Sequence, residues 1–381
     1  MNTIPKKVFL VVFDLGFFFS HRYYLIKELS KHNIEFTVIS YFEGSPPDNE
    51  KNIQYHFINS SRETFGLFNL ILNSITLSRL IRLRDPDLIY AVSHRSIFLA
   101  RFANLFIGKK SLYAITGMGS MFTKQLSILT NIYTAILRFI ALKIYKLMIK
   151  GKGVYFLLQN KGDQEFLADQ NISNALNSYI IPGNGLEESF FHSPVMVEQE
   201  IFQFIMISRI LKDKGVIEFL VAAKKVLELY PESEFILYGA FDLTNPHSIS
   251  SEELQKYLSP SIRYAGYEKN IKAKILNSSV VVLPSYREGF SRVLMEAQAC
   301  SKPIITSDIS GCRDVIINNK TGYLVQPANT NDLAAKMIAM IKDSDNYSKF
   351  SLNAYNHARE NFSVDKAVQE HVEVFNRITS K

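Results

Sequence analysis

The sequence predicts an α/β protein of two domains, each built on a doubly wound parallel sheet. A chain of 381 residues is long for one compact domain, and its 47% hydrophobic residues are enough for two cores. Strand-like and helix-like segments alternate through most of the chain, as expected when helices join parallel strands. Between the two halves, residues 180–200 open with three prolines or glycines among six residues, which is typical of a connector.

The first half contains five short apolar or β-branched runs that predict strands. They are residues 8–13, 35–40, 85–92 (a turn and then a strand), 110–116 and 154–160. Helical spacing is present from Tyr23 to Lys31 and from Ile97 to Phe106, and a long helical stretch runs to about residue 150.

The second half repeats this alternation. Its predicted strands are residues 202–208, 234–239, 262–267, 280–285 and 303–308, with helices such as Val216–Leu229 and Ser291–Cys300 between them. After Asn331 the pattern is helical to the end. Two such domains facing each other would leave a cleft at the carboxyl ends of both sheets, where α/β folds bind ligands.

The N-terminal segment and the cysteines favour a reducing compartment. The apolar run Val8–Phe13 is six residues long and is followed by Asp14, so it predicts a buried strand and not a signal peptide. Cys300 and Cys312 have no metal-type spacing, and free thiols fit them best. The most apolar stretch, Gln125 to Ile149, contains three cations and therefore makes a poor spanning helix.

The net charge of +7 belongs to the first half. Residues 1–195 carry 21 Lys and Arg against 14 Asp and Glu, whereas residues 196–381 carry 22 of each. Leu88 to Gly162 contains 11 basic residues and no acidic one. Such a run is either a solvated face or, because large apolar residues are interleaved with the cations, a surface for an anionic membrane. Nucleic acid is a weaker alternative, since no recognised binding motif accompanies the charge.

Two common cofactor motifs are absent from the sequence. The first strand is followed by FDLGFFFSHR, which has one glycine and so lacks a dinucleotide fingerprint, and no Walker-type sequence occurs. Nicotinamide-dependent and ATP-dependent reactions are therefore disfavoured.

Two glutamates in the second half flank a predicted helix start. Glu288 lies in the loop after strand 280–285, Ser291 is the expected N-cap, and Glu296 lies about a turn and a half into the helix. The backbone N–H groups of Phe290, Ser291 and Arg292 are expected to be free, which would form an anion site. Such carboxylates suit a nucleotide sugar, because one can accept hydrogen bonds from the ribose hydroxyls and the other from the sugar. Two surface glutamates on an ordinary helix would give the same sequence pattern.

The segment E288-GFSRVLM-E296 resembles the E-x7-E motif of the family 4 (group 1) retaining glycosyltransferases, which have the GT-B fold. SRILKDKG (208–215) is similar to that family's segment that neutralises the donor diphosphate, which assigns this role to Arg209 and Lys214. Residues 311–316 and 321–334 also match, so the resemblance covers 202–342 closely. It implies that Glu288 positions the donor sugar and Glu296 the ribose, with Gly289 beside them.

The N-terminal half resembles a bacterial subgroup that extends sugars on undecaprenyl diphosphate during O-antigen, capsule or protein-glycan assembly. The similar segments are FDLGFFFSHR, AITGMGSMFT (114–123), LLQNKGDQEFL (157–167) and the linker IIPGNGLEESFF (180–191), where Asn184 and Leu186–Glu187 depart from the usual residues. The resemblance adds Gly16 to the donor site. Its candidates for the acceptor or the cleft are His21, Arg22, Arg95, Thr116, Gly117 and Gly119. Ser20 is expected to be the N-cap before His21, and no role is transferred to His94.

The resemblance implies two domains with separate substrates. Residues 1–185 would bind the lipid-linked acceptor, residues 186–361 would bind a UDP-sugar, and a C-terminal helix from about 362 to 381 would pack back on the first domain. The enzyme would transfer a hexosyl or N-acetylhexosaminyl group with retention, without a metal or other cofactor, at the cytoplasmic face of the inner membrane. A sugar-nucleotide epimerase of the same fold and a non-catalytic membrane scaffold are the alternatives.

Overall fold

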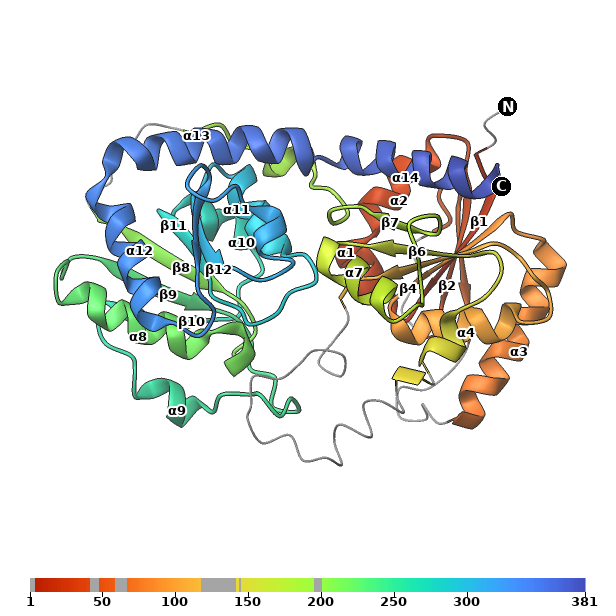
Figure 1. The fold of residues 1–381 in the computed structure, drawn as a ribbon, viewed down its shortest axis with the longest axis horizontal. Helices are drawn as coiled ribbons and strands as arrows, with labels where there is room; N and C mark the ends of the chain where they lie inside the picture. The colour runs from red at the N-terminus through yellow and green to blue at the C-terminus, as the bar shows by residue number, and fades with distance from the viewer. Residues whose placement is uncertain are drawn as a thin grey trace. The chain divides into compact units, whose positions relative to one another are not determined.

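The computed structural model describes residues 4–41, 48–58, 67–117, 142–143, 145–194 and 201–380. The chain divides into two compact units (Figure 1). Unit 1 comprises residues 1–185 and 364–381, and unit 2 comprises residues 186–363. Each unit contains one sheet whose neighbouring strands are all parallel, so the predicted fold class is confirmed.

The sheet of unit 1 has seven strands in the order β3-β2-β1-β4-β5-β6-β7. Their bounds are β1 Lys7–Val12, β2 Glu35–Ser40, β3 Ile53–Phe57, β4 Leu88–Val92, β5 Ser111–Ile115, β6 Val154–Leu158 and β7 Ser178–Ile180. Central strands such as β4 are buried along their whole length, because helices cover both faces of a parallel sheet. The strand order reverses at β1, which lies between β2 and β4.

Helices on the two faces of this sheet form two separate hydrophobic cores. The helices are α1 Leu15–His21, α2 Tyr23–Ser30, α3 Leu67–Arg84, α4 His94–Asn104, α7 Lys161–Asp169 and α14 Val364–Thr379. Successive strand residues point to opposite faces, so Leu10 and Tyr90 join the core with α2 and α14. Phe9 and Ile89 join the core with α3 and α4.

A buried polar chain connects α14 to the sheet of unit 1. Arg22 Nη1 donates to the hydroxyl of Tyr90 at 2.9 Å, and this hydroxyl lies 3.2 Å from His371 Nε2. His371 Nδ1 lies 2.7 Å from the carbonyl of Ala367 in the same helix. Complete burial lowers the pKa of His371 from its ordinary 6.5 to about 3, so the ring is neutral in the folded protein.

This histidine predicts a loss of stability in mild acid. Below about pH 6.5 the unfolded chain protonates His371 while the folded protein does not, so its contribution to stability is present above pH 6.5 and decreases as the pH falls towards 3. The free energy of unfolding should fall by about 1.4 kcal/mol per pH unit through this residue. His371→Gln keeps a hydrogen-bonding side chain and cannot titrate. Urea unfolding at pH 7 and pH 5 should therefore show a steeper pH dependence in the wild type, and equal slopes would contradict the assignment.

The sheet of unit 2 has six strands in the order β10-β9-β8-β11-β12-β13. Their bounds are β8 Gln203–Ile207, β9 Glu234–Tyr238, β10 Ile262–Gly266, β11 Val280–Leu283, β12 Ile304–Ser307 and β13 Gly322–Val325. The α-helices are α8 Val216–Leu227, α9 Ser251–Gln255, α10 Ile271–Leu276, α11 Arg292–Ala299, α12 Thr330–Lys342 and α13 Ser344–Asn361. Short 3₁₀ helices are η2 Glu188–Phe190, η3 Lys212–Lys214 and η4 Arg313–Val315. The order reverses at β8, between β9 and β11.

All ten predicted strands are present within a few residues of their expected ends. The sequence pattern did not identify β3, β7, β13, α1, α3 or α7. β3 is largely half-buried and alternates little, and β7 has three residues of mixed exposure, so neither shows an apolar run. The predicted helical stretch 125–149 lies mostly outside the described residues, of which 142–143 and 145–149 are helical. Among the described helices, none combines the length and hydropathy needed to cross a membrane.

Candidate functional site

The loops after β8 and β11 meet at the point where the strand order of unit 2 reverses. β8 pairs with β9 on one side and with β11 on the other. Ligands of open α/β sheets bind at the carboxyl ends of the strands beside such a reversal. The loops at this position are residues 208–215 and 284–291, which contain most of the predicted donor-site residues.

Two glycines allow the backbone to approach closely in this region. Gly215 has φ +75°, and a Cβ placed on it would lie 2.2 Å from the carbonyl oxygen of Pro284. Gly311 has φ +84°, and its Cβ would lie 2.5 Å from the carbonyl oxygens of both Glu288 and Gly289. Real Cβ atoms do not reach such distances, so both positions require glycine. Sequence reasoning gave neither of them a role.

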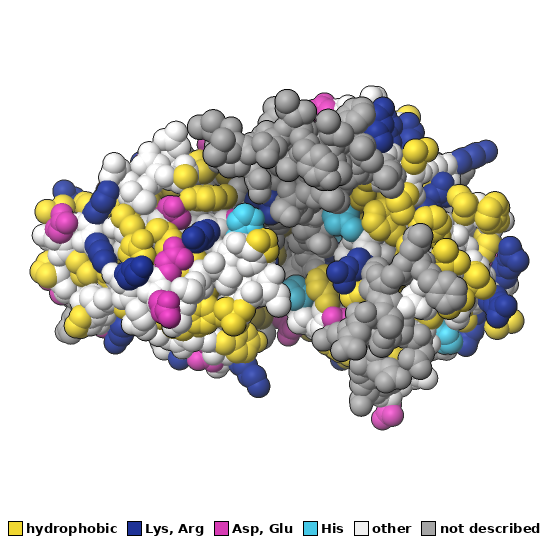
Figure 2. All heavy atoms as spheres, turned by 90° about the horizontal axis from the view of Figure 1, so that it is seen from below, with side chains coloured by type: hydrophobic (Ala, Val, Ile, Leu, Met, Phe, Trp, Pro, Cys, Tyr) yellow, Lys and Arg dark blue, Asp and Glu magenta, His cyan; other side chains and the backbone are white. Residues whose placement is uncertain are grey.

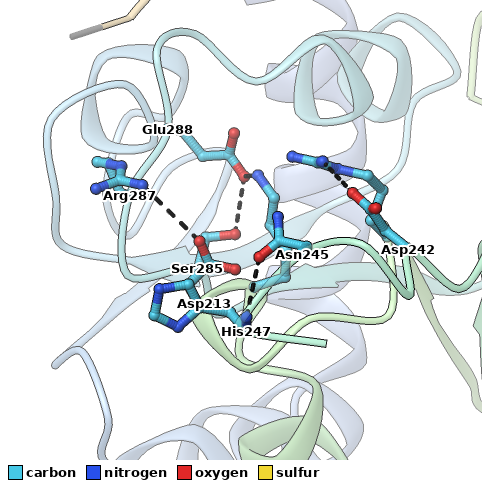
Figure 3. Close-up of polar contacts among 9 residues, drawn as sticks. Asp213, Asp242, Asn245, His247, Ser285, Arg287 and Glu288 are labelled. Atoms are coloured by element: carbon cyan, nitrogen blue, oxygen red, sulfur yellow. Dashed lines mark hydrogen bonds and ion pairs between the residues drawn. The ribbon is translucent and has the colours of Figure 1, made fainter. Parts of the chain in front are cut away.

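Lys214 and Glu288 form a close ion pair across the two loops. Lys214 Nζ lies 2.6 Å from Glu288 Oε1, and Ser285 Oγ donates to the same oxygen at 2.8 Å (Figure 3). The two charged side chains are 18% and 15% exposed, respectively, so water screens the pair only in part. The structure therefore brings together a predicted phosphate-binding cation and a predicted sugar-binding carboxylate.

Arg209 pairs with an aspartate that the sequence did not single out. Its Nη1 lies 2.8 Å from Asp242 Oδ2 in the loop after β9. Thr244 donates its hydroxyl to the other carboxylate oxygen at 2.9 Å. The hydrogen bond from Thr244, together with Arg209, lowers the pKa of Asp242, which keeps this carboxylate ionised. The signal in the sequence would have been a polar segment, DLTN (242–245), three residues after a strand.

A second set of contacts ties the two loops together. The backbone N–H of Tyr286 donates to the carbonyl of Asp213 at 2.9 Å, and its hydroxyl donates to Glu218 Oε1 at 2.5 Å. Arg287 lies 3.9 Å from Asp213, as Figure 3 shows. Burial and the bond to Glu218 both raise the pKa of Tyr286, so its hydroxyl remains a donor. The position of Lys214 thus depends on residues from the loop after β11 and from α8.

The start of α11 differs in detail from the prediction. Ser291 is the N-cap by position, but its side chain makes no capping hydrogen bond. Its backbone N–H donates to the carbonyl of Gly311 at 3.3 Å, so the expectation that this N–H is free is wrong. The ring of Phe290 packs against Phe362 at 5.8 Å, which fixes the chain just before the helix.

Glu296 is buried on the inner side of α11. Its Oε1 accepts a hydrogen bond from Arg292 Nε at 2.7 Å, one turn earlier. Burial raises the pKa of Glu296, and the charge of Arg292 partly opposes this shift. A buried carboxylate with one oxygen already paired has a fixed direction, which suits a side chain that holds a ligand hydroxyl.

In unit 1, α1 begins directly after β1. The N-cap is Asp14, whose carboxylate accepts from the N–H of Phe17 at 2.8 Å, so the expectation of a Ser20 N-cap is wrong. Gly16 lies in the first turn of α1. His21 stacks on Phe17 with ring centroids 4.8 Å apart, and its Nδ1 lies 2.6 Å from Ser20 Oγ. His21 is exposed and can contact a ligand.

The prediction that Arg22 lines the cleft is wrong, because its side chain is buried. Its side chain is 2% exposed and bonds to Tyr90 within unit 1. It supports α14 from inside and offers no surface to an acceptor. His21 and Arg22 are neighbours in the sequence, so the sequence alone does not show that only Arg22 is buried. Arg22 immediately precedes α2, which begins at Tyr23, and its side chain points into unit 1.

The remaining candidates in unit 1 lie at the start of α4 and in the loop after β5. Arg95 lies over the ring of Phe13 at 4.7 Å, and Thr116 and Gly117 follow β5. His94 Nε2 lies 3.1 Å from the carbonyl of Gly117, and its Nδ1 lies 2.9 Å from the hydroxyl of Tyr145. Burial lowers the pKa of His94, and a neutral ring fits this placement. His94 therefore holds the loop in which Gly117 lies, while Gly119 is outside the described residues.

Two family models match the chain. The model described as glycosyl transferases group 1 matches residues 191–357, and the model described as glycosyl transferase 4-like matches residues 7–150. The chain is 28% identical over 350 residues to N,N'-diacetylbacillosaminyl-diphospho-undecaprenol alpha-1,3-N-acetylgalactosaminyltransferase of Campylobacter jejuni, with 86% of each chain covered.

Two further similarities extend over most of the chain. It is 23% identical to the UDP-Gal:alpha-D-GlcNAc-diphosphoundecaprenol alpha-1,3-galactosyltransferase of Escherichia coli, covering 84% of this chain and 83% of that protein. The structure is similar to that of a glycosyltransferase from Rickettsia africae, with a TM-score of 0.75 at 20% identity and 98% of both chains covered.

Proposed function

This chain belongs to the group 1 glycosyltransferases and has their GT-B fold, and from this premise we propose that it transfers a sugar from a UDP-sugar to a saccharide carried on undecaprenyl diphosphate. The proposed group is a hexosyl or N-acetylhexosaminyl residue, and the setting is the assembly of a bacterial surface polysaccharide such as O-antigen or capsule, or of a protein glycan. The relatives from Campylobacter jejuni and Escherichia coli support this proposal, since both are named for undecaprenol-linked acceptors and one for a UDP-sugar.

The main support for a donor site in unit 2 is the Lys214–Glu288 ion pair, which lies where the strand order of its sheet reverses. As the glycosidic bond to the diphosphate breaks, negative charge develops on the leaving oxygen. Lys214 and Arg209 would stabilise this charge, together with the backbone near Gly289 at the start of α11. Both cations already lie against carboxylates, Glu288 and Asp242, which hold them in place before the donor arrives.

The two glutamates have different proposed tasks. Glu288 is tied to Lys214 and Ser285, so a sugar hydroxyl bound there would lie next to the departing diphosphate. Glu296, directed by Arg292, would accept hydrogen bonds from the ribose. Gly16, Gly289, Phe290, Ser291 and Arg292 complete the proposed donor contacts.

Retention of configuration is proposed for the transfer. The acceptor hydroxyl would attack from the face that the diphosphate leaves, within a short-lived ion pair. One carbon–oxygen bond to the diphosphate breaks, one to the acceptor forms, and the acceptor proton passes to the departing diphosphate. No side-chain nucleophile is required. Proton NMR of the product tests this step through the coupling constant of the anomeric proton. A coupling constant that shows the anomeric configuration opposite to that of the donor would exclude retention.

Unit 1 is proposed to bind the lipid-linked acceptor at the carboxyl edge of its sheet. His21, Arg95, Thr116 and Gly117 lie in the segments that follow β1, β4 and β5, and Gly119 belongs to the same sequence segment. Because the proposed acceptor is linked to a membrane lipid, the enzyme is proposed to be a peripheral protein on the anionic cytoplasmic face of the inner membrane.

Incubation with a panel of UDP-sugars tests the function directly. With a synthetic undecaprenyl-diphosphate saccharide present, one donor should give a lipid product longer by one sugar, together with free UDP. Conversion of a UDP-sugar into another UDP-sugar without an acceptor would favour an epimerase instead. Absence of turnover with every donor and acceptor would favour a non-catalytic scaffold.

A further inference from the structure

The solvent-facing side of α3 has an unusual composition for a soluble helix. Apart from Arg84 at its C-terminal end, its exposed residues form one continuous face, and they are Ile71, Leu72, Ile75, Thr76, Arg79, Arg82 and Leu83. The inward side of the same helix contains the buried polar residues Asn73 and Ser74 beside its apolar ones. The helices of soluble proteins normally have charged and polar residues on the outer side, so the apolar residues on the outer side of α3 are the unusual feature.

The end of α4 extends this face. Ser78 of α3 donates its hydroxyl to the carbonyl of Ala103 at 2.6 Å, which places the end of α4 against the middle of α3. Phe102, Leu105 and Phe106 are exposed there, and Phe106 is 87% exposed. Figure 2 shows hydrophobic and basic side chains side by side on the surface of unit 1. A cluster of this kind on one surface marks an interaction site.

The charge of this face indicates which partner it fits. Neither α3 nor α4 contains an acidic residue, whereas α3 ends with Arg79, Arg82 and Arg84. Arg79 and Arg82 are exposed, and neither forms an ion pair with a residue that the structure describes. A protein partner of ordinary composition needs no such bias. An anionic phospholipid surface attracts the cations and accepts the apolar side chains between its headgroups.

We propose that the exposed face of α3, together with Phe102, Leu105 and Phe106, is the surface by which this enzyme docks on anionic phospholipid. The proposal rests on the proposed function, because an undecaprenyl-linked acceptor is held in a membrane. It assigns the contact to α3 and the end of α4, a part of unit 1 that lies largely before the acid-free stretch 88–162. Ile71, Leu72 and Ile75 insert between lipids, while Arg79 and Arg82 pair with headgroup phosphates.

Co-sedimentation with lipid vesicles tests this surface, with one variant for each of its components. Arg79→Gln/Arg82→Gln should lower the partition coefficient onto phosphatidylglycerol-containing vesicles at least tenfold, since each cation contributes about fivefold. Binding of this variant to pure phosphatidylcholine vesicles should not change. Ile71→Ser/Ile75→Ser should weaken binding to both kinds of vesicle. All four residues are exposed, so thermal unfolding should match the wild type.

The matched control is Lys349→Gln/Leu352→Ser on α13 in unit 2, which removes one exposed cation and one exposed apolar residue from another helix. It should bind vesicles like the wild type. Lys214→Ala should also bind normally, so that loss of docking and loss of catalysis are distinguishable. Equal partitioning of all variants would overturn the proposal. It would equally be overturned if the wild type without vesicles were a dimer that both α3 variants made monomeric, because the face would then be a protein contact.

Discussion

Replacing Lys214 with alanine is expected to lower kcat/KM for sugar transfer by about 10²- to 10³-fold, the usual loss when one preorganised group that stabilises developing negative charge is removed. Lys214 Nζ is held 2.6 Å from Glu288, within a pair that is mostly shielded from water. A fixed cation in such a place needs little reorganisation when charge develops on the diphosphate. Arg209, which is 57% exposed, cannot replace it at the same position.

The fold should tolerate this substitution. Lys214 ends the short 3₁₀ helix η3, and Glu288 keeps its hydrogen bond from Ser285 when the lysine is absent. Lys212→Ala is the matched control, because Lys212 lies in the same turn, is 55% exposed and pairs with Glu253 at 3.3 Å. Initial rates with a labelled UDP-sugar and thermal melting should be measured on both variants. Near-wild-type transfer by Lys214→Ala would exclude the charge-stabilising role.

Gly215→Ala is expected to cause a large loss of stability at the site. The added Cβ would lie 2.2 Å from the carbonyl oxygen of Pro284, and that oxygen belongs to backbone that side-chain rotation cannot move. Relief requires the loops after β8 and β11 to separate, which would pull Lys214 away from Glu288. Transfer activity should therefore fall along with stability.

Gly266→Ala is the control that separates the cost of the steric clash with Pro284 from the cost of backbone strain. Gly266 has φ +76°, almost the same as the +75° of Gly215, but a Cβ there would meet nothing within 4 Å. Both variants bear the cost of a left-handed residue, and only Gly215→Ala adds overpacking, which costs about 1–3 kcal/mol. Denaturant unfolding should show this difference in the free energy of unfolding. Equal losses for the two variants would show that the contact with Pro284 has no energetic weight.

Several local features of unit 1 and of the site were not predictable from sequence spacing alone. Asp14 and Ser20 are both good N-cap residues, and the choice between them depends on where β1 ends against β2 and β4. Arg22 and His21 are neighbours in the chain, yet packing of α2 and α14 buries the first and leaves the second exposed. The N–H of Ser291 is engaged because Gly311 lets another loop approach it.

The sequence by itself determined the two parallel sheets, the family and the residues proposed for the donor site. Those features depend on local patterns: apolar runs between helices, and the spacing of Glu288 and Glu296 along one helix start. Tertiary structure alone decided which charges meet. Lys214 and Glu288 are 74 residues apart, and they pair because β8 lies beside β11 in the sheet, while β9 and β10 lie on its other side. That strand order results from the packing of helices over the whole sheet, which no local stretch of sequence specifies.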